Sequence, residues 1–318
     1  MMIKRKNNAF STAAGYAYSW IAVVLVVCVC LFIVVNVAVE GSHVISRDFI
    51  LTEPTASARN AEDGGILTPL VGTVLLTVLG IGVAFPFSLA TAIYLCFYSK
   101  KGLMRGAIKT AIDVLSGVPT IVIALFALSV FTKPWLAFLS APVELAGGIV
   151  ERAYGKSFFV ASITMAAMIL PFVIKAMEEA IRSVPQSFIE GAYALGASKW
   201  RMISKVVLKC ATEGLVTGVI LGMGRIIGDT AIVWLALGGT LRMSGTQPWY
   251  LPENWLSTLK NTGLTLTSYI YYTSPVGEGN NYAVAFGASL VLIAMIVLLN
   301  AMTAVIGSIA KVRVKSNG

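Results

Sequence analysis

The sequence predicts an all-α polytopic membrane protein, and its composition and apolar segments both support this prediction. Hydrophobic residues make up 57% of the 318 residues and charged residues 12%, whereas about a quarter of the residues of a soluble domain are charged. The mean hydropathy is +0.82. Several apolar segments reach the roughly 20 residues that a helix needs to cross hydrocarbon, whereas a membrane β-barrel shows alternating segments of about 10 residues.

Apolar runs predict six spans within a single transmembrane domain over residues 1–318. The first span follows a basic segment, residues 4–6, and is longer than the apolar core of a signal peptide, so we expect an uncleaved helix. The second and fifth runs exceed what a bilayer requires, so these helices either tilt or break, and Pro86 offers a break in the second. The first predicted span is about 20–39. The five core helices over 69–308 are predicted at about 69–95, 107–131, 157–177, 206–238 and 283–308.

The stretch 135–150 is also apolar, but it is short and contains Pro142. We expect it to pack at the membrane interface and not to span.

The basic residues predict the orientation, because cytoplasmic loops carry an excess of Lys and Arg. With the N-terminus inside, most of the 24 Lys and Arg residues fall on the cytoplasmic side, and Arg225 is left within the fifth span. An even number of spans places both termini on the same side. We therefore predict a multi-pass protein of the cytoplasmic (inner) membrane with both termini in the cytoplasm.

Several function classes receive no support from the sequence. No basic tract alternates with aromatic residues, so nucleic acid is not an expected partner. The four cysteines lie in or beside apolar runs, and the single histidine, His43, has no clustered partners, so we expect no metal site. No GxxxxGK[ST] motif is present, so we expect no nucleotide site of that kind in this chain. We also expect no catalytic residue and no cofactor bound by it.

The most charged cytoplasmic loop, residues 183–200, reads SVPQSFIEGAYALGASKW and predicts a short helix. Ser183 is expected to cap this helix and Pro185 to occupy its first turn. Gly196 is expected to end it, and Ser198 to cap the next helix, which enters the membrane.

Small residues leave the backbone of this loop nearly bare, and large apolar side chains stand between them. Local physics supports two interpretations equally: a surface on which another protein docks closely, or an ordinary loop that joins two helices. The residues of the candidate docking surface are Glu190, Gly191, Ala192, Gly196, Lys199 and Trp200.

Arg225 and Asp229 are the most informative charged residues, since their spacing predicts a pair on one helical face. An ionised residue near the bilayer centre costs roughly 2.5–3.5 kcal/mol, so such groups usually face protein or a water-filled path. A guanidinium matches an oxyanion, and Asp229 either orients it or accepts a proton from the anion. Alternatively, the pair is only a salt bridge between helices. Thr230 adds a hydroxyl to the path or bonds back to a helix carbonyl.

Three further features predict local geometry. Gly224 and Gly228 have the spacing that permits close helix packing. Asp113 follows Lys109 by one helical turn, and we expect these two residues to form an ion pair. Pro119 is expected to kink the third span beside the pathway.

The loop resembles the EAA signature of ABC-importer permease subunits, in which Glu-Ala-Ala and a later Gly form a coupling helix. The matching residues are Glu190, Gly191, Ala192 and Gly196, with Gly191 in place of the usual Ala. A second departure lies downstream, where such permeases commonly have Leu-Pro and this chain has Lys209 after a leucine. Without that proline, the start of span five is expected to stay straight.

Other segments are similar to PstA-type subunits of phosphate importers and follow in the family's order: 51–73, 117–125, 224–233 and 261–280. One departure is Asp229, where Glu is usual. The resemblance implies the type I ABC importer permease fold and half of the translocation pathway of an ATP-driven phosphate importer.

The partners that the resemblance implies are two PstB-like ATPase subunits that use ATP and Mg²⁺, a PstS-like phosphate-binding protein outside, and a PstC-like second permease or another copy of this chain. The aromatic outer segment 268–282 either docks the binding protein or belongs to an interfacial aromatic belt. Three alternative functions stay open: a permease for another oxyanion such as molybdate or sulfate, an ion-coupled secondary transporter, and a membrane sensor.

Overall fold

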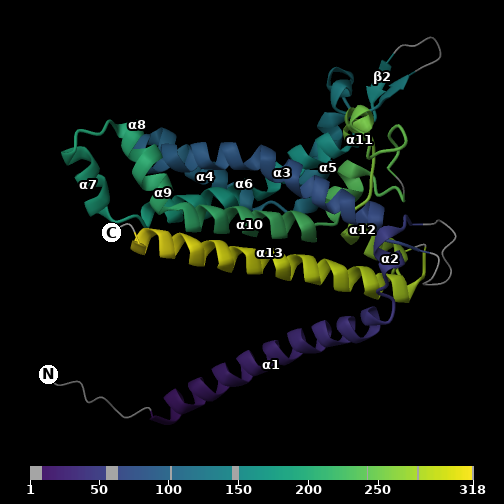
Figure 1. Ribbon diagram of the computed structural model, residues 1–318, viewed down its shortest axis with the longest axis horizontal. Helices are drawn as coiled ribbons and strands as arrows, with labels where there is room; N and C mark the ends of the chain where they lie inside the picture. The colour runs from purple at the N-terminus through teal and green to yellow at the C-terminus, as the bar shows by residue number, and fades with distance from the viewer. Residues whose placement is uncertain are drawn as a thin grey trace.

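Long helices lying side by side form the body of the molecule (Figure 1). The computed structural model describes residues 9–54, 64–100, 102–144, 150–241, 243–277 and 279–316. In this part of the chain, four helices are long and apolar enough to cross a membrane, and the number rises to six if each of two bent helix pairs counts as one span. The six predicted spans correspond to these segments.

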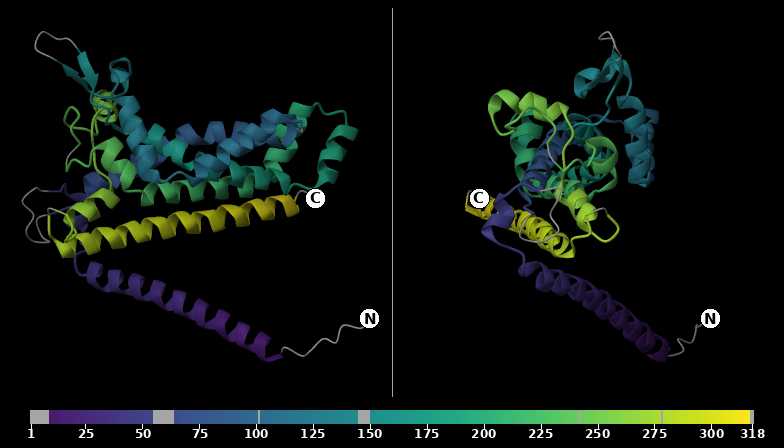
Figure 2. Two further views of the ribbon diagram at one scale, coloured as in Figure 1. Left: turned by 180° about the vertical axis from the view of Figure 1, so that it is seen from behind. Right: turned by 90° about the vertical axis from the view of Figure 1, so that its right-hand side faces the viewer.

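The first helix, α1 (Ala9–Ser42), diverges from the bundle, and Figure 2 shows the same divergence from behind. In its apolar window no residue is buried. Near its C-terminal end it meets α13 (Tyr282–Ser316), where a Cβ on Gly41 would lie 2.7 Å from the carbonyl oxygen of Phe286. The start of α1 and the end of α13 lie at the same end of the bundle (Figure 1).

The core forms where α6 (Phe158–Arg182) packs between α3 (Leu67–Ile93) and α10 (Thr212–Gly228). α3 follows the short α2 (Arg47–Leu51) and continues into a π-helical turn, η1 (Tyr94–Tyr98). The break offered by Pro86 does not occur, because α3 stays helical through it. In a membrane, a proline inside a helix is tolerated where neighbouring groups satisfy the freed carbonyl.

A stripe of glycines brings α10 close to α6. A Cβ on Gly214 would lie 2.5 Å from that of Ala180, and Cβ atoms on Gly218 and Gly222 would also crowd α6. The prediction that Gly224 and Gly228 pack is wrong within this chain, since nothing in the described part lies within 4 Å of a Cβ at either position. The two glycines lie with Leu221 and Arg225 on the side of α10 that is most exposed in the described part of the chain, called the uncovered side below.

The predicted third span is two helices, α4 (Leu103–Gly117) and α5 (Thr120–Phe131), bent by 104°. Pro119 precedes α5, and Val118 before it is extended (φ −73°, ψ 126°), because a residue before proline is disfavoured in the helical region. The expected kink is therefore a complete break.

The fifth span is interrupted twice. Four segments precede its long helix α10: α7 (Gln186–Ala194), α8 (Lys199–Met202), the π-helical turn η3 (Ile203–Val207) and α9 (Leu208–Cys210). The straight start that we expected without a proline is wrong, because Lys199–Cys210 and Thr212–Gly228 are bent by 69°. The Thr212 hydroxyl donates to the carbonyls of Leu208 and Lys209, both at 2.9 Å, so the bend leaves these acceptors satisfied. Beyond α10, the chain breaks at Asp229 before a second π-helical turn, η4 (Val233–Leu237).

Short elements cover the end of the bundle opposite α7 (Figure 1). They are η2 (Pro134–Leu139), the antiparallel strands β1 (Pro142–Glu144) and β2 (Val150–Ala153), η5 (Pro252–Asn254), α11 (Trp255–Lys260) and α12 (Leu266–Thr273). The stretch 135–150 therefore does not span in its described residues, as expected, and residues 145–149 lie outside the described part.

Replacement of Gly72 by alanine is expected to destabilise the fold. A Cβ on Gly72 would collide with the backbone carbonyl of Leu264, which cannot rotate away as a side chain does. Overpacking of this kind costs about 1–3 kcal/mol, measured as the free energy of unfolding in detergent. Gly82→Ala on the same helix is the matched control, because nothing lies within 4 Å of a Cβ there. Equal stability of the two variants would contradict this packing.

Candidate functional site

The short helix α7 stands away from the bundle and exposes most of its side chains (Figures 1 and 2). Leu195 is 90% exposed and Trp200 60% exposed. A Cβ on Gly191 would have nothing within 4 Å. Ala192 is the exception among the predicted small residues, because it is buried against its own chain. The helix thus presents a bare, partly apolar surface at one end of the molecule.

The boundaries of α7 follow the predicted signals only in part. Gly196 has a φ of +75°, a conformation that favours glycine, and ends the helix as expected. Ser198 accepts from the backbone N–H of Arg201 at 3.4 Å and caps α8, also as expected. The capping role of Ser183 is wrong, because its hydroxyl donates to the carbonyl of Ala180 at the end of α6. The place of Pro185 in the first turn is also wrong, because it is the residue before α7, which begins without a side-chain cap.

Lys199 ties this region to the end of the second span. Its Nζ donates to the Phe97 carbonyl at 2.6 Å and lies 4.4 Å from the centre of the Tyr98 ring. Neither partner was predicted, since both lie far away in the sequence. Glu190 is exposed and makes no recorded side-chain contact in the described part of the chain.

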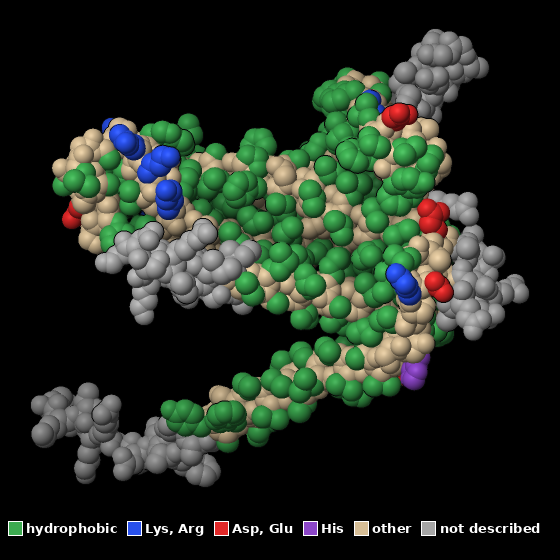
Figure 3. All heavy atoms as spheres, viewed as in Figure 1, with side chains coloured by type: hydrophobic (Ala, Val, Ile, Leu, Met, Phe, Trp, Pro, Cys, Tyr) green, Lys and Arg blue, Asp and Glu red, His purple; other side chains and the backbone are tan. Residues whose placement is uncertain are grey.

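Basic side chains gather at the same end of the molecule, over α8 and its neighbours, on the face drawn in Figure 3. The exposed basic residues of this segment are Lys199, Arg201, Lys205 and Lys209. This end therefore carries the positive charge expected of a cytoplasmic surface.

Arg225 lies on the uncovered side of α10, and its guanidinium rests on α6. Nε donates to the sulfur of Met168 at 3.0 Å, and the guanidinium carbon lies 3.8 Å from the centre of the Phe172 ring. The ion pairs recorded among the described residues do not include Arg225. Its guanidinium is thus held in place by a sulfur and an aromatic face, and it forms no ion pair with a carboxylate of the described residues.

The predicted pair of Arg225 and Asp229 is not formed, because Asp229 lies beyond the end of α10 in an extended conformation. Its Oδ1 accepts from the backbone N–H of Ile232 at 2.8 Å, and its carbonyl accepts from the Thr267 hydroxyl at 3.1 Å. The carboxylate therefore caps the helical turn that follows the break, which is the role an aspartate performs at a helix start.

Thr230 lines an open cleft of about 1130 Å³ near the break. Tyr271 and Tyr272 of the aromatic outer segment line the same cleft, while Tyr269 is buried in the core. Among the hydrogen bonds of the described residues, none belongs to the Thr230 hydroxyl, so the bond back to a helix carbonyl is not seen. The cleft lies next to the break at Asp229, and its lining includes both apolar and polar side chains.

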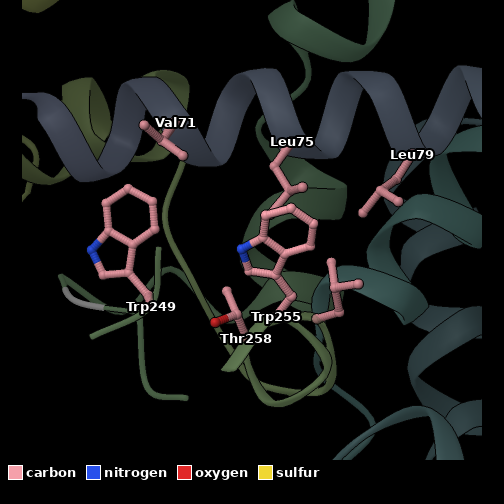
Figure 4. Close-up of a pocket in the computed structure, with 7 residues that line it drawn as sticks. Val71, Leu75, Leu79, Trp249, Trp255 and Thr258 are labelled. Atoms are coloured by element: carbon pink, nitrogen blue, oxygen red, sulfur yellow. The ribbon is translucent and has the colours of Figure 1, made fainter. Parts of the chain in front are cut away.

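A second pocket, of about 280 Å³, has a different character (Figure 4). Leu75 and Leu79 of α3 face Trp249 and Trp255 across it. The indole N–H groups bond elsewhere, that of Trp249 to Glu53 at 3.1 Å and that of Trp255 to a backbone carbonyl at 3.2 Å. This apolar pocket offers an anion no donor and is not part of the candidate pathway.

Ion pairs connect α4 with α6 at the end near α7. The predicted pair of Lys109 and Asp113 is wrong, because each residue pairs across to α6. Asp113 contacts Lys175 at 2.7 Å, and Lys109 contacts Glu178 at 3.6 Å. Glu178 also accepts from Arg182 at 2.7 Å. Lys175 was not predicted as a paired residue, although an ionisable residue inside an apolar run is a signal that could have identified it.

Comparison with known families decides what kind of protein presents this arrangement. A family model described as "Binding-protein-dependent transport system inner membrane component" matches residues 82–315. The chain belongs to this family. It is therefore a permease component of a transport system in a membrane, with several membrane-spanning helices.

Named relatives place the permease more narrowly. The "Phosphate transport system permease protein PstA 1" of Mycobacterium tuberculosis (strain CDC 1551 / Oshkosh) is 30% identical over 78% of this chain and 72% of that protein. The PstA protein of Yersinia pestis is 27% identical over 87% of this chain and 82% of that protein. A PstC protein of Xylella fastidiosa (strain Temecula1 / ATCC 700964) is 31% identical over 57% of this chain and 58% of that protein. The permease is thus of the PstA type.

Solved structures support the fold. A chain of a bacterial alginate ABC transporter in complex with an alginate-bound periplasmic protein has a TM-score of 0.60 at 17% identity, covering 96% of this permease and 99% of that chain. A chain of the MetNI methionine ABC transporter in an inward-facing conformation has a TM-score of 0.55 at 16% identity, covering 76% and 93%. The permease has the fold of ABC importer permeases.

Asp229 is expected to act as a helix cap and not as a necessary charge. Asp229→Asn retains an N-cap acceptor and is expected to keep the free energy of unfolding, whereas Asp229→Ala loses about 1 kcal/mol. Unfolding in detergent measures both variants. A stable Asp229→Asn protein that has nevertheless lost transport would show that the charge itself is required.

Proposed function

We propose that this permease is the transmembrane subunit of an ATP-driven importer of inorganic phosphate and forms half of its translocation pathway. The observation that carries the proposal is Arg225, a cation without a carboxylate partner on the uncovered side of α10. Its surroundings are apolar, and the named relatives are permeases of phosphate transport systems. These two facts together favour phosphate over other solutes.

The position of Arg225 supports contact with an anion. α10 runs through the bundle, and a charged residue there is costly unless it faces water or protein. Met168 and Phe172 fix the guanidinium through Nε and one face of the group. This geometry leaves its Nη groups for a ligand, and a guanidinium fork matches two oxygens of a phosphate. Gly224 and Gly228, on the same uncovered side, keep the space around it free of side chains.

α7 is the proposed contact with the ATPase subunits. It projects from the bundle, its backbone is accessible at Gly191, and Leu195 is almost fully exposed. The chain has no phosphate-binding loop motif of its own, so energy has to arrive through other subunits. Two PstB-like ATPases that bind and hydrolyse ATP with Mg²⁺ would move α7, and α8 with η3 would pass that motion to α10.

The remaining partners are proposed to bind at the uncovered side of α10 and at the end of the bundle opposite α7. A second permease, PstC-like or another copy of this chain, covers the side of α10 that carries Arg225 and completes the pathway. A PstS-like phosphate-binding protein delivers the anion at the end opposite α7, where the cleft beside Thr230 opens. Both termini are then cytoplasmic, since α1 begins and α13 ends at the same end of the molecule as α7 (Figure 1).

Replacement of Arg225 is expected to abolish uptake while leaving the fold intact. Arg225→Ala removes the guanidinium proposed to bind the anion and is expected to lower the rate of labelled phosphate uptake at least tenfold. Arg225→Lys keeps the positive charge but loses the forked guanidinium, so its uptake rate is expected to lie between those of the wild type and Arg225→Ala. The exposed Arg47 of α2 provides the control Arg47→Ala. Full uptake by Arg225→Ala would remove the pathway role.

The identity of the anion is tested by competition. Uptake of labelled phosphate is measured in cells with and without this chain, in the presence of excess molybdate or sulfate. We expect uptake to depend on the chain and to resist both competitors. Uptake that is unchanged without the chain would exclude phosphate import. Transport that never requires an associated ATPase would instead indicate an ion-coupled transporter.

Leu195→Glu is expected to weaken the ATPase contact. A charge on the tip of α7 would be buried against the partner, so the yield of co-purified ATPase in mild detergent is expected to fall about tenfold, as for loss of a contact worth about 1.4 kcal/mol. Trp135→Glu is the matched control, since Trp135 is 71% exposed at the opposite end. Equal yields from the two variants would place the ATPase contact elsewhere.

A further inference from the structure

α6 carries a second cation on the face where Arg225 rests. Lys175 lies one helical turn beyond Phe172, so the two side chains share a face, and both are exposed. At about 1.5 Å per residue, Lys175 lies about 4.5 Å closer to the α7 end than Phe172. The two cations therefore follow one another along the proposed direction of transport.

Lys175 is neutralised by a carboxylate from another helix. Its Nζ lies 2.7 Å from Oδ1 of Asp113 on α4, and both side chains are at least half exposed. α6 continues to Arg182, which places Lys175 about 10 Å before the end of that helix. A lysine at that depth would be costly alone, and Asp113 offsets its charge.

The neighbouring pair on the same two helices differs in its exposure. Glu178 is only 14% exposed and is engaged by both Arg182 and Lys109. It lies toward the inside of the bundle, where it also approaches the thiol of Cys96 through its carbonyl. The pair of Lys109 and Glu178 therefore belongs to the packing of α4 on α6. The pair of Asp113 and Lys175 lies open on the face.

An open pair of this kind contributes little to stability. Ion pairs in contact with water are worth about 0–1 kcal/mol, since both side chains lose freedom and solvent screens the attraction. Such a pair is correspondingly easy to separate. A passing oxyanion is negatively charged, as Asp113 is, and competes with it for the ammonium.

We propose that Lys175 is a second anion-contacting residue of the pathway, one helical turn inward of the Arg225 site, and that Asp113 is the counter-ion which the passing phosphate displaces. This inference rests on the proposed function. Asp113 weakens the hold of Lys175 on phosphate, so that the anion leaves toward the cytoplasm and does not stay bound. Conduction in general requires successive sites that each bind weakly enough to release.

The two members of the pair are expected to change phosphate affinity in opposite directions. Lys175→Gln removes an attractive charge and is expected to raise the phosphate concentration for half-maximal thermal stabilisation about tenfold. Asp113→Asn frees the ammonium and is expected to lower that concentration about tenfold. Both variants are expected to slow uptake, the first by weaker capture and the second by slower release.

The experiment uses the complete importer in nanodiscs. Its midpoint of thermal unfolding is measured against inorganic phosphate without the solute-binding protein, at constant ionic strength, and ATP-driven uptake is measured in proteoliposomes with that protein present. Lys109→Gln is the matched control, because Arg182 still engages Glu178, and it is expected to leave the phosphate response unchanged. Shifts of Lys175→Gln and Asp113→Asn in the same direction, or no shift, would overturn the inference.

A charge exchange separates this role from a structural one. The double variant Asp113→Lys with Lys175→Asp restores the ion pair and assembly but moves the cation from α6 to α4, so uptake is expected to stay low. Wild-type uptake by the double variant would reduce the pair to a helix contact. If the wild-type importer itself neither responds to phosphate nor transports it, the proposed function fails, and not only this inference.

Discussion

The close approach of α10 to α6 determines where Arg225 lies. Gly214, Gly218 and Gly222 form one stripe of α10 and let its backbone rest on Ala176 and Ala180 of α6. With a side chain at these positions, the helices would separate by the width of a methyl group or more. Arg225 follows directly after the stripe, so its guanidinium arrives over the ring of Phe172 and not in the core. Backbone packing thus positions the charge.

Local sequence signals predicted what local physics controls. The apolar runs located the spans, and Gly196 and Ser198 marked the boundaries around α7, because a left-handed residue and a capping hydroxyl act within one turn. Residue spacing did not predict the partners of the charged residues. Asp229 stands one turn after Arg225 only if the helix continues, and it ends at Gly228. Asp113 has a lysine one turn away on its own helix, yet it pairs with the helix beside it. Spacing along one chain segment contains no information about a neighbouring helix.

Breaks in the helices followed their surroundings more than the presence of proline. Pro86 lies within α3 without ending it, whereas Pro119 separates two helices bent by 104°. The bend before α10 has no proline and is accommodated by a π-helical turn and by the Thr212 hydroxyl, which satisfies two carbonyls. A proline that removes a backbone donor is visible in the sequence, but the groups that satisfy the freed carbonyls in the folded protein are not. The PstA-type resemblance for residues 51–73 also extends into a stretch outside the described residues, 55–63.

The contact of Lys199 with the end of the second span has a mechanical consequence. Its ammonium bonds to the Phe97 carbonyl and lies against the Tyr98 ring, both in η1, while its own backbone begins α8. A force applied to α7 would therefore act on two parts of the bundle that start from this contact, α3 and the segment from α8 to α10. Tilting one without the other would break a charged hydrogen bond. If α7 is displaced, this contact is expected to move the adjoining ends of α3 and of the segment from α8 to α10 together.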